Sequence, residues 1–480
     1  MTSPASATTW RVAVIGGGLS GLAAAQRLQE LSVQWKRPLD LVLFEAGTRL
    51  GGLVGTRSIA GYRAELGADS FITNKPWGLD LCRRLGLEDR LVPTNQQFRR
   101  SLVVRRGKPL PVPDGFQLIS PVDVGAVLRS SIFSWPGKLR MGLEYFLPRG
   151  GTDADESLAH FVRRRFGREA LDRLVQPLVG GIYTSDPEKL SLRATLPRFL
   201  EMEREHGSLI RALRRQQGAG RAEDSGASGA RYGLFVTLAK GISELVEALA
   251  AKVEKSAGVL LETEIQAIIP EEGGRGFVLE LPHGARDNFD AVIVALPAYR
   301  AAKLTAGFLP GAAEALGQIE YASTVVVVSG HKLTDVQHPL DAFGLVVPAI
   351  EKRKILAVSF TSRKFPGRAP DGCVQLRTFV GGAMQPELMK LTDDEIKALV
   401  RGELRDLLGV GGKPDFEIVA RWTRSMPQYH VGHLDLVGRI EADVNRFANL
   451  ALAGNALHGV GIPDAVHSGE LAAERVFAAP

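Results

Sequence analysis

The chain has 480 residues, of which 45% are hydrophobic and 23% are charged. These proportions are ordinary for a globular protein and exclude a disordered or fibrous chain. A chain of this length exceeds what one compact core usually accommodates, so we expect two or more domains that share a long interface. The formal charge of +6 favours anionic ligands or surfaces, but the basic residues are spread along the chain and do not indicate nucleic-acid binding.

Two features of the sequence bear on its place in the cell. Cys82 and Cys373 are too few and too far apart for a disulfide framework, which favours a reducing compartment. The N-terminal residues lack the charged and then apolar stretches of a signal peptide, and no apolar run reaches the roughly 18 residues of a membrane-spanning helix. We therefore expect a cytoplasmic protein.

The first fifty residues predict a strand, a glycine turn, a helix and a second strand. Apolar residues 11–15 come before the glycines, residues 22–31 are rich in Ala and Leu, and residues 39–44 are again apolar. This order is typical of a crossover unit in a parallel sheet. From about residue 100 to 205 the sequence changes to helix-like segments with Pro and Gly breaks, including 156–166 and 170–179, and predicts a helical insertion.

The second half of the chain mixes strands and helices. Residues 216–231 are small and polar and predict a mobile loop, because they bury too little apolar surface to become ordered. Next, we expect a helix at 242–253, and strands with small hairpins at 259–269, 276–281 and 290–295. The later predicted elements are strands at 325–328, 345–347, 355–360 and 374–380, a helix at 393–408, a strand at 450–453 and a closing helix at 465–477.

Gly16, Gly18 and Gly21 form a G-x-G-x-x-G pattern directly after the first strand, where the first helix opens. The first glycine allows a tight turn, the second lets the backbone approach a pyrophosphate, and the third lets helix and strand pack closely. The free N–H groups at the helix N-terminus favour an anionic phosphate. The pattern therefore predicts dinucleotide binding.

The residues after the second strand narrow the choice of dinucleotide. Glu45 ends that strand, where an acid accepts hydrogen bonds from the adenosine ribose hydroxyls. Arg49, Gly51 and Gly52 then form a second, cationic glycine turn that nicotinamide-dependent dehydrogenases do not need at this position. Together these features favour FAD over NAD as the cofactor.

Several segments resemble a known family. The opening, Gly454-Asn455 and HGVGIP at 458–463 resemble the FAD-dependent amine oxidase and phytoene desaturase superfamily. FVRRRFG at 161–167, PLVGGIYTSDPEKL at 177–190, EHGSLI at 205–210 and SMPQY at 425–429 resemble the protoporphyrinogen and coproporphyrinogen oxidase family. The resemblance covers nearly the whole chain.

The resemblance implies an α/β fold class: a discontinuous Rossmann-like FAD-binding domain, a mixed α+β substrate domain and a helical insertion. The FAD-binding domain is expected to be assembled from three stretches, 1–98, 223–302 and 436–480. Residues 99–222 are expected to form the helical insertion that lines the substrate site, and 303–435 the mixed sheet that binds substrate.

The activity implied by the resemblance is FAD-dependent oxidation of a porphyrinogen to the porphyrin in haem biosynthesis. A meso carbon passes a hydride to flavin N5 once binding holds the two atoms in contact, so no dedicated acid or base is needed. Three such steps, with dioxygen reduced to hydrogen peroxide each time, complete the porphyrin. Two alternatives stay open: an FAD amine oxidase or carotenoid desaturase-like enzyme of the same superfamily, and a non-enzymatic tetrapyrrole carrier.

The resemblance also leaves two porphyrinogens open, coproporphyrinogen III with four propionates and protoporphyrinogen IX with two. The insertion near 33–38, MPQYHVGH at 426–433 and GVGIPD at 459–464 resemble the coproporphyrinogen-oxidising branch of Gram-positive bacteria more closely. Four propionates call for additional cations, and Lys75 and Arg57 are candidates.

Site residues are carried over from the family position by position. Arg100 matches an arginine that pairs with a substrate propionate, and Ser359 matches a pocket position where relatives usually have an aliphatic residue. Ala68 stands where relatives often have proline, so its loop is expected to be less rigid. The other implied substrate residues are Gly181, Phe343, Gly344, Val346 and Phe379, and the other FAD contacts are Gly67, Ile265, Trp422, Gly454, Val460, Gly461 and Ile462.

Other chemistries have little support in the sequence. His430 and His433 stand three apart but have no further ligands nearby, so no metal is expected. Ser191 and Ser208 lack the context of a nucleophile elbow. The basic helical insertion and IFSWP at 132–136 suggest peripheral contact with the inner face of the cell membrane, although a soluble protein with a covered substrate tunnel is equally consistent. Transient contact with the next haem-pathway enzyme is a further expectation.

Overall fold

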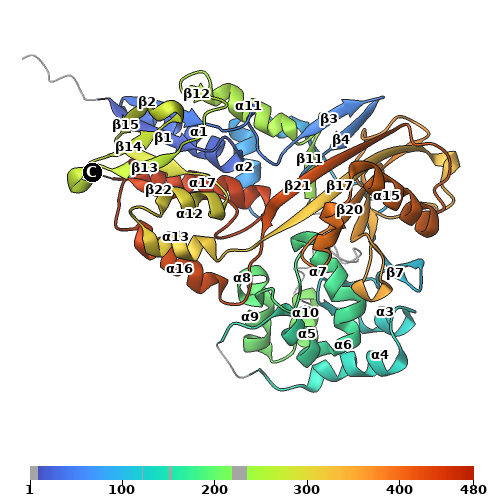
Figure 1. The fold of residues 1–480 in the computed structure, drawn as a ribbon. Helices are drawn as coiled ribbons and strands as arrows, with labels where there is room; N and C mark the ends of the chain where they lie inside the picture. The colour runs from blue at the N-terminus through green and yellow to red at the C-terminus, as the bar shows by residue number, and fades with distance from the viewer. Residues whose placement is uncertain (1–8, 122, 151–153, 219–234, 480) are drawn as a thin grey trace, which may run out of the picture.

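The computed structural model describes residues 9–121, 123–150, 154–218 and 235–479. Figure 1 shows three parts: an α/β part around β1 (Trp10–Ile15), a part around the long strand β17 (Tyr321–Lys332), and a helical part around α5 (Leu158–Phe166). Within the described ranges, no helix is long and apolar enough to cross a membrane.

The α/β part is built on five strands in the order β12-β2-β1-β16-β22, and all four pairings are parallel. Side chains of a strand point alternately to the two faces of the sheet. Val12 and Val14 accordingly belong to the core on one face, and Ala13 and Ile15 to the core on the other. The other strands of this sheet are β2 (Leu39–Phe44), β12 (Gly258–Leu260), β16 (Ala291–Val294) and β22 (Leu450–Leu452).

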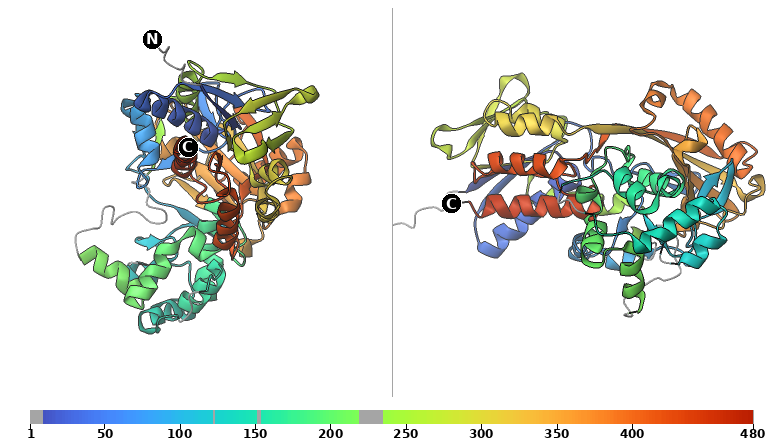
Figure 2. Two further views of the ribbon diagram at one scale, coloured as in Figure 1. Left: turned by 90° about the vertical axis from the view of Figure 1, so that its left-hand side faces the viewer. Right: turned by 90° about the horizontal axis from the view of Figure 1, so that it is seen from below.

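Helices cover both faces of this sheet. On one face, α1 (Leu19–Trp35) packs against α17 (Ile462–Phe477), where a β-carbon at Gly469 would stand 2.1 Å from the Ser20 carbonyl oxygen. The first and last helices therefore meet at backbone contact. On the other face, Val437 of α16 (His433–Val444) belongs to the same core as Ala13, and Figure 2 shows this helix roughly parallel to α17. The other covering elements are α2 (Trp77–Arg84), α11 (Ser243–Val253), β13 (Ala267–Pro270), β14 (Phe277–Glu280), β15 (Arg286–Phe289), α12 (Ala298–Thr305) and α13 (Pro310–Gly317).

The second part is a seven-stranded sheet in the order β21-β17-β20-β19-β18-β7-β8, antiparallel except for the parallel pair of β18 and β7. Helix α15 (Asp393–Leu408) covers one face, where Leu404 and Leu408 belong to the same core as Val325 and Val327. The opposite face is turned toward the α/β and helical parts. Its remaining strands are β7 (Leu102–Arg105), β8 (Lys108–Pro111), β18 (Gly344–Val346), β19 (Ala357–Phe360), β20 (Cys373–Gly381) and β21 (Phe416–Pro427).

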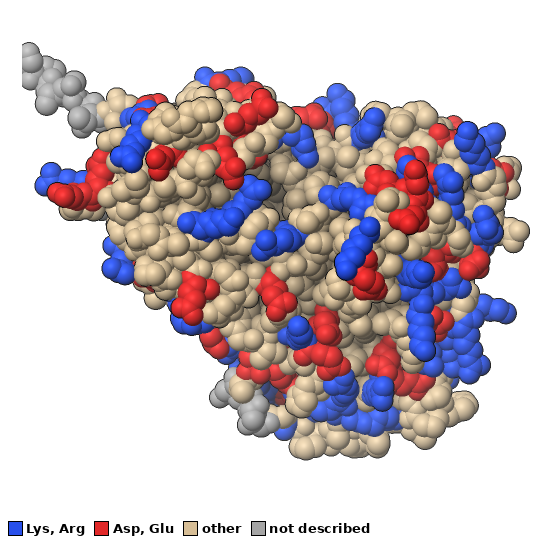
Figure 3. All heavy atoms as spheres, in the orientation of Figure 1, with Lys and Arg blue, Asp and Glu red and all other residues tan. Residues whose placement is uncertain are grey.

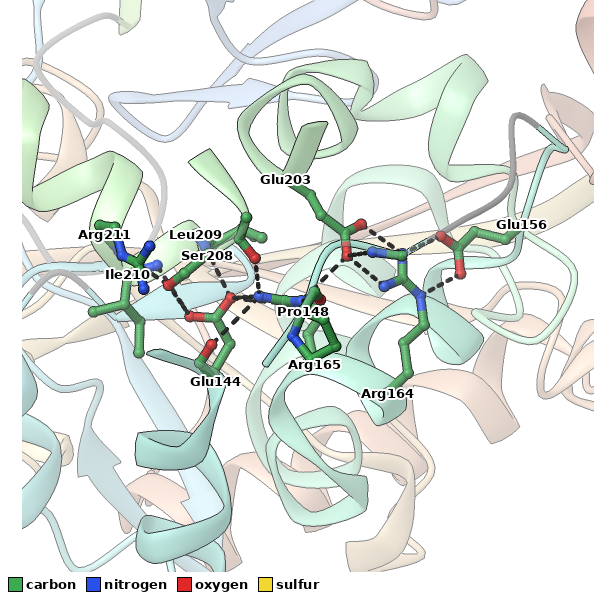
Figure 4. Close-up of polar contacts among 12 residues, drawn as sticks. Glu144, Pro148, Glu156, Arg164, Arg165, Glu203, Ser208, Leu209, Ile210 and Arg211 are labelled. Atoms are coloured by element: carbon green, nitrogen blue, oxygen red, sulfur yellow. Dashed lines mark hydrogen bonds and ion pairs between the residues drawn. The ribbon is translucent and has the colours of Figure 1, made fainter. Parts of the chain in front are cut away.

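The helical part has its own apolar core and a buried polar network, the helical network of Glu144, Glu156, Arg164, Arg165 and Glu203 (Figure 4). Glu144 is fully buried and ion-paired with Arg165, and it accepts hydrogen bonds from the backbone N–H groups at positions 209 (2.8 Å) and 210 (3.2 Å). The carboxylate thus caps the start of α10. The helices of this part are α3 (Val124–Arg129), α4 (Trp135–Gly142), α6 (Arg168–Ala170), the π-helical turn η3 (Leu171–Val175), α7 (Gln176–Tyr183), α8 (Leu192–Thr195), α9 (Pro197–His206) and α10 (Leu209–Gly218).

The remaining elements of the described residues are short. They are β3 (Thr56–Ile59), β4 (Tyr62–Glu65), β5 (Phe71–Ile72), η1 (Glu88–Arg90), β6 (Leu91–Pro93), β9 (Phe116–Gln117), β10 (Ser120–Pro121), η2 (Leu143–Phe146), β11 (Phe235–Leu238), η5 (Glu272–Gly274), η6 (Pro282–Gly284), η7 (Leu333–Asp335), η8 (Ala349–Glu351), α14 (Thr361–Lys364) and η9 (Pro386–Lys390). The β7–β8 hairpin lies within the range 99–222 and pairs into the seven-stranded sheet.

Most predicted elements are present. The strand at 39–44 and the helix at 393–408 are confirmed to the residue by β2 and α15. The single strand expected over 259–269 is wrong, because the chain between β12 and β13 bends around the end of β2, where the Glu262 N–H donates to the Gly47 carbonyl at 3.0 Å. The expected mobile loop at 216–231 lies outside the described residues except for 216–218, which end α10.

Candidate active site

The glycine turn after β1 has the geometry that its three roles require. Gly16 has a φ of 110°, and a β-carbon there would stand 2.4 Å from the Ala295 carbonyl oxygen. A β-carbon at Gly21 would stand 1.8 Å from the Gly16 carbonyl oxygen, so helix and turn touch directly. At Gly18, in contrast, a β-carbon would meet no atom within 4 Å. The open space at the N-terminus of α1 is where a pyrophosphate fits.

The C-terminal segment returns to the same edge of the sheet. Ile15 pairs with Val294, and Val294 pairs with Leu452, so β1, β16 and β22 end at one level. Gly454 lies two residues after the end of β22 and donates its N–H to the Ser468 hydroxyl at 3.0 Å. Since neighbouring strands lie about 4.8 Å apart, the ends of β1 and β22 are separated by about 10 Å. The two stretches predicted to enclose the dinucleotide therefore face each other.

The side chain of Tyr429 holds the C-terminal segment after β22 in place. Its hydroxyl donates to the Asn455 carbonyl at 2.7 Å and accepts from the Gly459 N–H at 2.8 Å. Burial raises the pKa of Tyr429, which keeps the hydroxyl protonated. The Tyr429 ring stacks on His433 at 3.9 Å between centroids, and His433 Nε2 is 2.9 Å from the Leu457 carbonyl oxygen. Both side chains thus shape the segment that leads to Val460, Gly461 and Ile462, a role that the sequence did not reveal.

Glu45 and Arg49 organise the backbone of the two glycine turns. The Glu45 carboxylate accepts hydrogen bonds from the N–H groups of Gly17 and Gly47, both at 2.7 Å. Arg49 donates to the carbonyls of residues 50, 52 and 54 at 2.8–3.1 Å. The Gly51 N–H donates to the Gly17 carbonyl at 2.8 Å. This hydrogen bond joins the two glycine turns, residues 16–21 and 49–52, into one unit, hereafter the glycine cradle.

Ile265 lies beside this cradle. The Thr263 N–H donates to the Glu45 carbonyl at 2.9 Å, which draws the chain before β13 along the end of β2. Ile265 is 5% exposed and shares a core with Phe44. Its predicted backbone contact with the adenine stays a prediction, and its position at the end of β2 is compatible with it.

The loop of residues 66–69, hereafter the flavin loop, contains the predicted FAD contacts Gly67 and Ala68. A β-carbon at Gly67 would stand 1.8 Å from the Leu53 carbonyl oxygen, so the loop packs against the second glycine turn. Trp422 donates its indole N–H to the Leu66 carbonyl at 2.7 Å. The Trp422 side chain thus holds the flavin loop by a hydrogen bond to the loop backbone. Ala68 is exposed.

Four predicted substrate residues share one face of the seven-stranded sheet. Gly344 pairs with Ser359, while Val346 and Phe379 both pair with Ala357. Because cross-strand partners point to the same side, Gly344, Val346, Ser359 and Phe379 form a continuous surface, hereafter the pocket face. All four are partly exposed.

Gly181 approaches the pocket face from the helical part. A β-carbon at this position would lie 3.8 Å from Val346 Cγ1. The π-helical turn η3 comes just before α7, and such turns change the direction in which the following residues point. Gly181, Thr184, Leu356 and Gly382 border a narrow cleft between α7 and the sheet. The structure therefore brings Gly181 to the predicted pocket.

Arg100 and Phe343 lie at one end of this region. Arg100 is 46% exposed, pairs with the Asp341 carboxylate and donates to the Asp341 carbonyl at 2.7 Å. Phe343 is buried, and its N–H donates to the Arg100 carbonyl at 2.9 Å. A propionate at Arg100 would have to replace the Asp341 carboxylate, so this assignment stays a prediction. Lys75 is likewise engaged, 2.6 Å from Asp464, while Arg57 is exposed.

Arg377 was missed from the sequence; it stands next to Ser359 on the same side of the sheet and is 2% exposed. It donates to the Gly67 carbonyl and lies 3.0 Å from the Asp69 carboxylate. The signal that could have revealed it is a charged residue in the middle of the largely buried strand β20, CVQLRTFVG.

Comparisons with known proteins agree with this geometry. The family model for flavin containing amine oxidoreductases matches residues 19–477. A coproporphyrinogen III oxidase of Bacillus subtilis is 34% identical over 96% of both chains. A protoporphyrinogen oxidase 2 of Arabidopsis thaliana is 30% identical over 97% of this chain and 94% of its own length. A crystal structure from Exiguobacterium sp. 255-15 superposes with a TM-score of 0.86 at 28% identity, covering 98% of this chain and 99% of that one.

The family model and the full-length relatives account for both the glycine cradle and the C-terminal closure. The open space at Gly18, the joined turns and the facing segment after β22 fit an extended dinucleotide. FAD is therefore the cofactor. The chain belongs to the flavin-containing amine oxidoreductase family.

Proposed function

We propose that the protein is an oxygen-dependent oxidase that converts a porphyrinogen to the porphyrin in haem biosynthesis. Relatives named coproporphyrinogen III oxidase and protoporphyrinogen oxidase, which the chain matches over nearly its whole length, support this assignment. The observation that carries it is the contact between the flavin loop and Arg377, beside the pocket face. Cofactor site and candidate substrate surface are thus adjacent.

The chain contributes position and shielding to the reaction. When bound, FAD supplies the acceptor for a hydride. Val346 and Phe379 supply apolar surface for a macrocycle, and the missing side chain of Gly181 leaves room beside Val346. Holding the reacting carbon at a fixed distance lowers the entropic cost of the step, and apolar walls exclude water. No ionisable side chain has to move a proton to the reacting carbon.

Coproporphyrinogen III is the substrate that we favour. The coproporphyrinogen III oxidases of Bacillus subtilis and Staphylococcus aureus are 34% and 32% identical, compared with 30% for the plant protoporphyrinogen oxidase 2. Arg100, Lys75 and Arg57 are candidate partners for its propionates, and two of them already bind carboxylates of the protein.

Steady-state turnover tests this proposal. Purified protein with bound FAD is mixed in air with coproporphyrinogen III or with protoporphyrinogen IX, and porphyrin fluorescence and hydrogen peroxide are followed. We expect porphyrin and peroxide from both substrates, with the higher kcat/KM for coproporphyrinogen III. A higher kcat/KM for protoporphyrinogen IX would reverse the substrate assignment. Porphyrinogen binding without any peroxide would make the protein a carrier.

The domain boundaries 1–98, 99–222, 223–302, 303–435 and 436–480 are proposed together with this function. Three observations support a discontinuous FAD-binding domain: β1, β16 and β22 come from its three stretches, they form one sheet, and α1 and α17 pack together. The seven-stranded sheet forms the core of the substrate domain.

We also place the protein in the cytoplasm, with peripheral contact to the inner face of the membrane. Within the segment IFSWP, Ile132 and Phe133 are buried, but Trp135 is 67% exposed. Leu139 and Phe146 are also exposed, and the side chain of Arg129 at the end of α3 is 76% exposed. Figure 3 shows Lys and Arg gathered around the neighbouring region of β7 and α3. Apolar side chains beside cations are what an anionic lipid surface binds.

Sedimentation with vesicles tests this contact. Wild-type protein is mixed at low salt with vesicles that contain anionic lipid, and Trp135→Glu and Leu139→Glu are compared with it. The control is Val33→Glu, which changes an equally exposed apolar residue on α1. We expect the wild type and the control to sediment and the two variants to stay in solution. Wild-type protein that stays in solution would contradict membrane contact.

Transient transfer of porphyrin to the next enzyme would take place at this cytoplasmic location.

A further inference from the structure

Behind the flavin loop lies a set of buried ionic side chains, of which the proposed function has used only the contact of Arg377 with the loop. We call Glu65, Asp69, Lys364, Arg368 and Arg377 the buried charge cluster. Glu65 precedes the flavin loop and Asp69 is its last residue. Lys364 and Arg368 follow β19, and Arg377 comes from β20. Glu65, Arg368 and Arg377 are at most 2% exposed.

Arg377 joins the cofactor side of this region to the substrate side. Its guanidinium donates to the Gly67 carbonyl and lies 3.0 Å from the Asp69 carboxylate. The same guanidinium carbon is 5.3 Å from the centroid of the Phe379 ring. One buried side chain therefore touches the flavin loop, the carboxylate that ends it and a wall of the candidate pocket.

Asp69 is held as an anion between two cations. Its carboxylate oxygens lie 3.3 Å from Lys364 Nζ as well as 3.0 Å from Arg377. Burial would raise the pKa of Asp69, but Lys364 and Arg377 outweigh it and hold the pKa below its ordinary value. Asp69 is consequently ionised at neutral pH and fixes the orientation of the Arg377 guanidinium.

The remaining anchors of the flavin loop do not reach the pocket face in this way. Trp422 holds the Leu66 carbonyl, and Leu53 abuts Gly67 through its backbone. Arg368 turns instead to Glu65 at 3.3 Å and to the Thr237 hydroxyl at 2.6 Å. Arg377 is thus the cluster cation that contacts the loop backbone directly, among the contacts that the described residues make.

The cluster also carries an imbalance of charge. Lys364, Arg368 and Arg377 stand against Glu65 and Asp69, which leaves one cation in excess when all are ionised. Fixed positive charge in a water-poor site stabilises negative charge that develops nearby. A two-electron reduction adds negative charge to the flavin, so the excess favours the reduced cofactor.

We propose that Arg377 is a positioning residue of the flavin site. Through the Gly67 carbonyl and Asp69 it fixes the flavin loop relative to Phe379, and its charge raises the reduction potential of the bound flavin. The predicted effects on FAD affinity and on reduction potential rest only on FAD being the cofactor. The position of the flavin loop relative to the pocket face rests on the proposed function.

The test compares Arg377→Met and Arg377→Lys with a matched control, Arg421→Met. Arg421 belongs to the same sheet and makes the same kinds of contact, pairing with Asp393 and donating to two backbone carbonyls. For each variant, three quantities are measured without any substrate: the Kd of the apoprotein for FAD by flavin fluorescence, the midpoint potential of the bound flavin, and the Tm of the apoprotein.

For Arg377→Met we expect an FAD Kd about 10- to 100-fold above wild type, since a buried charge-assisted hydrogen bond is lost, and a more negative potential. Arg377→Lys keeps the charge and should recover most of the potential but little of the affinity. Arg421→Met should lower Tm only. Wild-type Kd and potential in Arg377→Met, with a fall in Tm like that of the control, would overturn the proposal.

A second variant covers the case in which Arg377→Met fails to fold. Asp69→Asn keeps the shape of the side chain and removes the charge that orients Arg377, so we expect a raised FAD Kd together with a less negative potential. Unchanged Kd and potential in Asp69→Asn, together with an unchanged Kd in Arg377→Lys, would count equally against the proposal. Absence of FAD binding by the wild-type protein would instead refute the proposed function.

Discussion

Two buried ionic networks of this molecule differ in where their hydrogen bonds lead. The helical network, with Glu144 and Arg165 at its centre, closes within the helical part and caps α10 (Figure 4). The buried charge cluster instead joins segments that are far apart in sequence and donates to the backbone of the flavin loop. Buried charge alone therefore does not mark a functional site, because ion pairs of purely structural value are buried as well.

The largest effect is expected where the helical network is broken. Glu144→Ala leaves the Arg165 guanidinium buried without its main partner, and such losses cost about 3–5 kcal/mol of unfolding free energy. Urea unfolding measures this loss, with Glu201→Ala on the exposed side of α9 as the control. The FAD affinity of the folded protein should stay at the wild-type value, and a weaker affinity would erase the distinction between the two networks.

A change in the glycine cradle should weaken FAD binding and leave the stability of the apoprotein unchanged. Gly18→Ala places a methyl group in the open space at the N-terminus of α1, where the backbone dihedrals suit alanine. We expect apoprotein Tm to stay unchanged and the Kd for FAD to rise about 10-fold or more, or at least 1.4 kcal/mol. Gly307→Ala, also in open space but far along the chain, is the control. Normal FAD binding by Gly18→Ala would show that the pyrophosphate lies elsewhere.

A smaller effect should appear with pH at the segment that closes the cradle. Burial lowers the pKa of His433 below its ordinary value of 6.5, so the folded protein prefers the neutral ring. The stability that this residue contributes is complete above pH 6.5 and is lost as the pH falls below it. His433→Gln should therefore lose less Tm between pH 7.5 and pH 5.5 than the wild type. Equal losses would mean that other groups dominate the acid response.

The features of the site that were predicted correctly from the sequence are those that local backbone chemistry determines. The roles of Gly16, Gly18 and Gly21 follow from their spacing after a strand, and the structure shows the close contacts and the open space that those roles require. The family resemblance predicted that the segment after Gly454 would return to this turn, and the register of β22 confirms it.

Contacts set by the register of distant strands were not predicted. The Arg377 hydrogen bond joins residues 310 positions apart, and nothing local to β20 indicates its partner. Strand β21 was missed because charged side chains such as Arg421 and Arg424 interrupt its apolar pattern. Trp422 was expected at the flavin, and the structure shows that its indole holds the Leu66 carbonyl. The aromatic segment at 132–136 divides between a buried and an exposed face, which composition alone could not separate.

The most direct test of the whole account is an anaerobic titration of the FAD-loaded protein with coproporphyrinogen III. We expect the visible absorption of the flavin to be bleached, because the first two-electron step reduces it. Admitting air should then restore the flavin, and porphyrin absorption should appear as dioxygen takes up the remaining electrons. Flavin absorption that persists after the porphyrinogen has bound would contradict the claim that the cradle and the pocket face meet in one oxidase site.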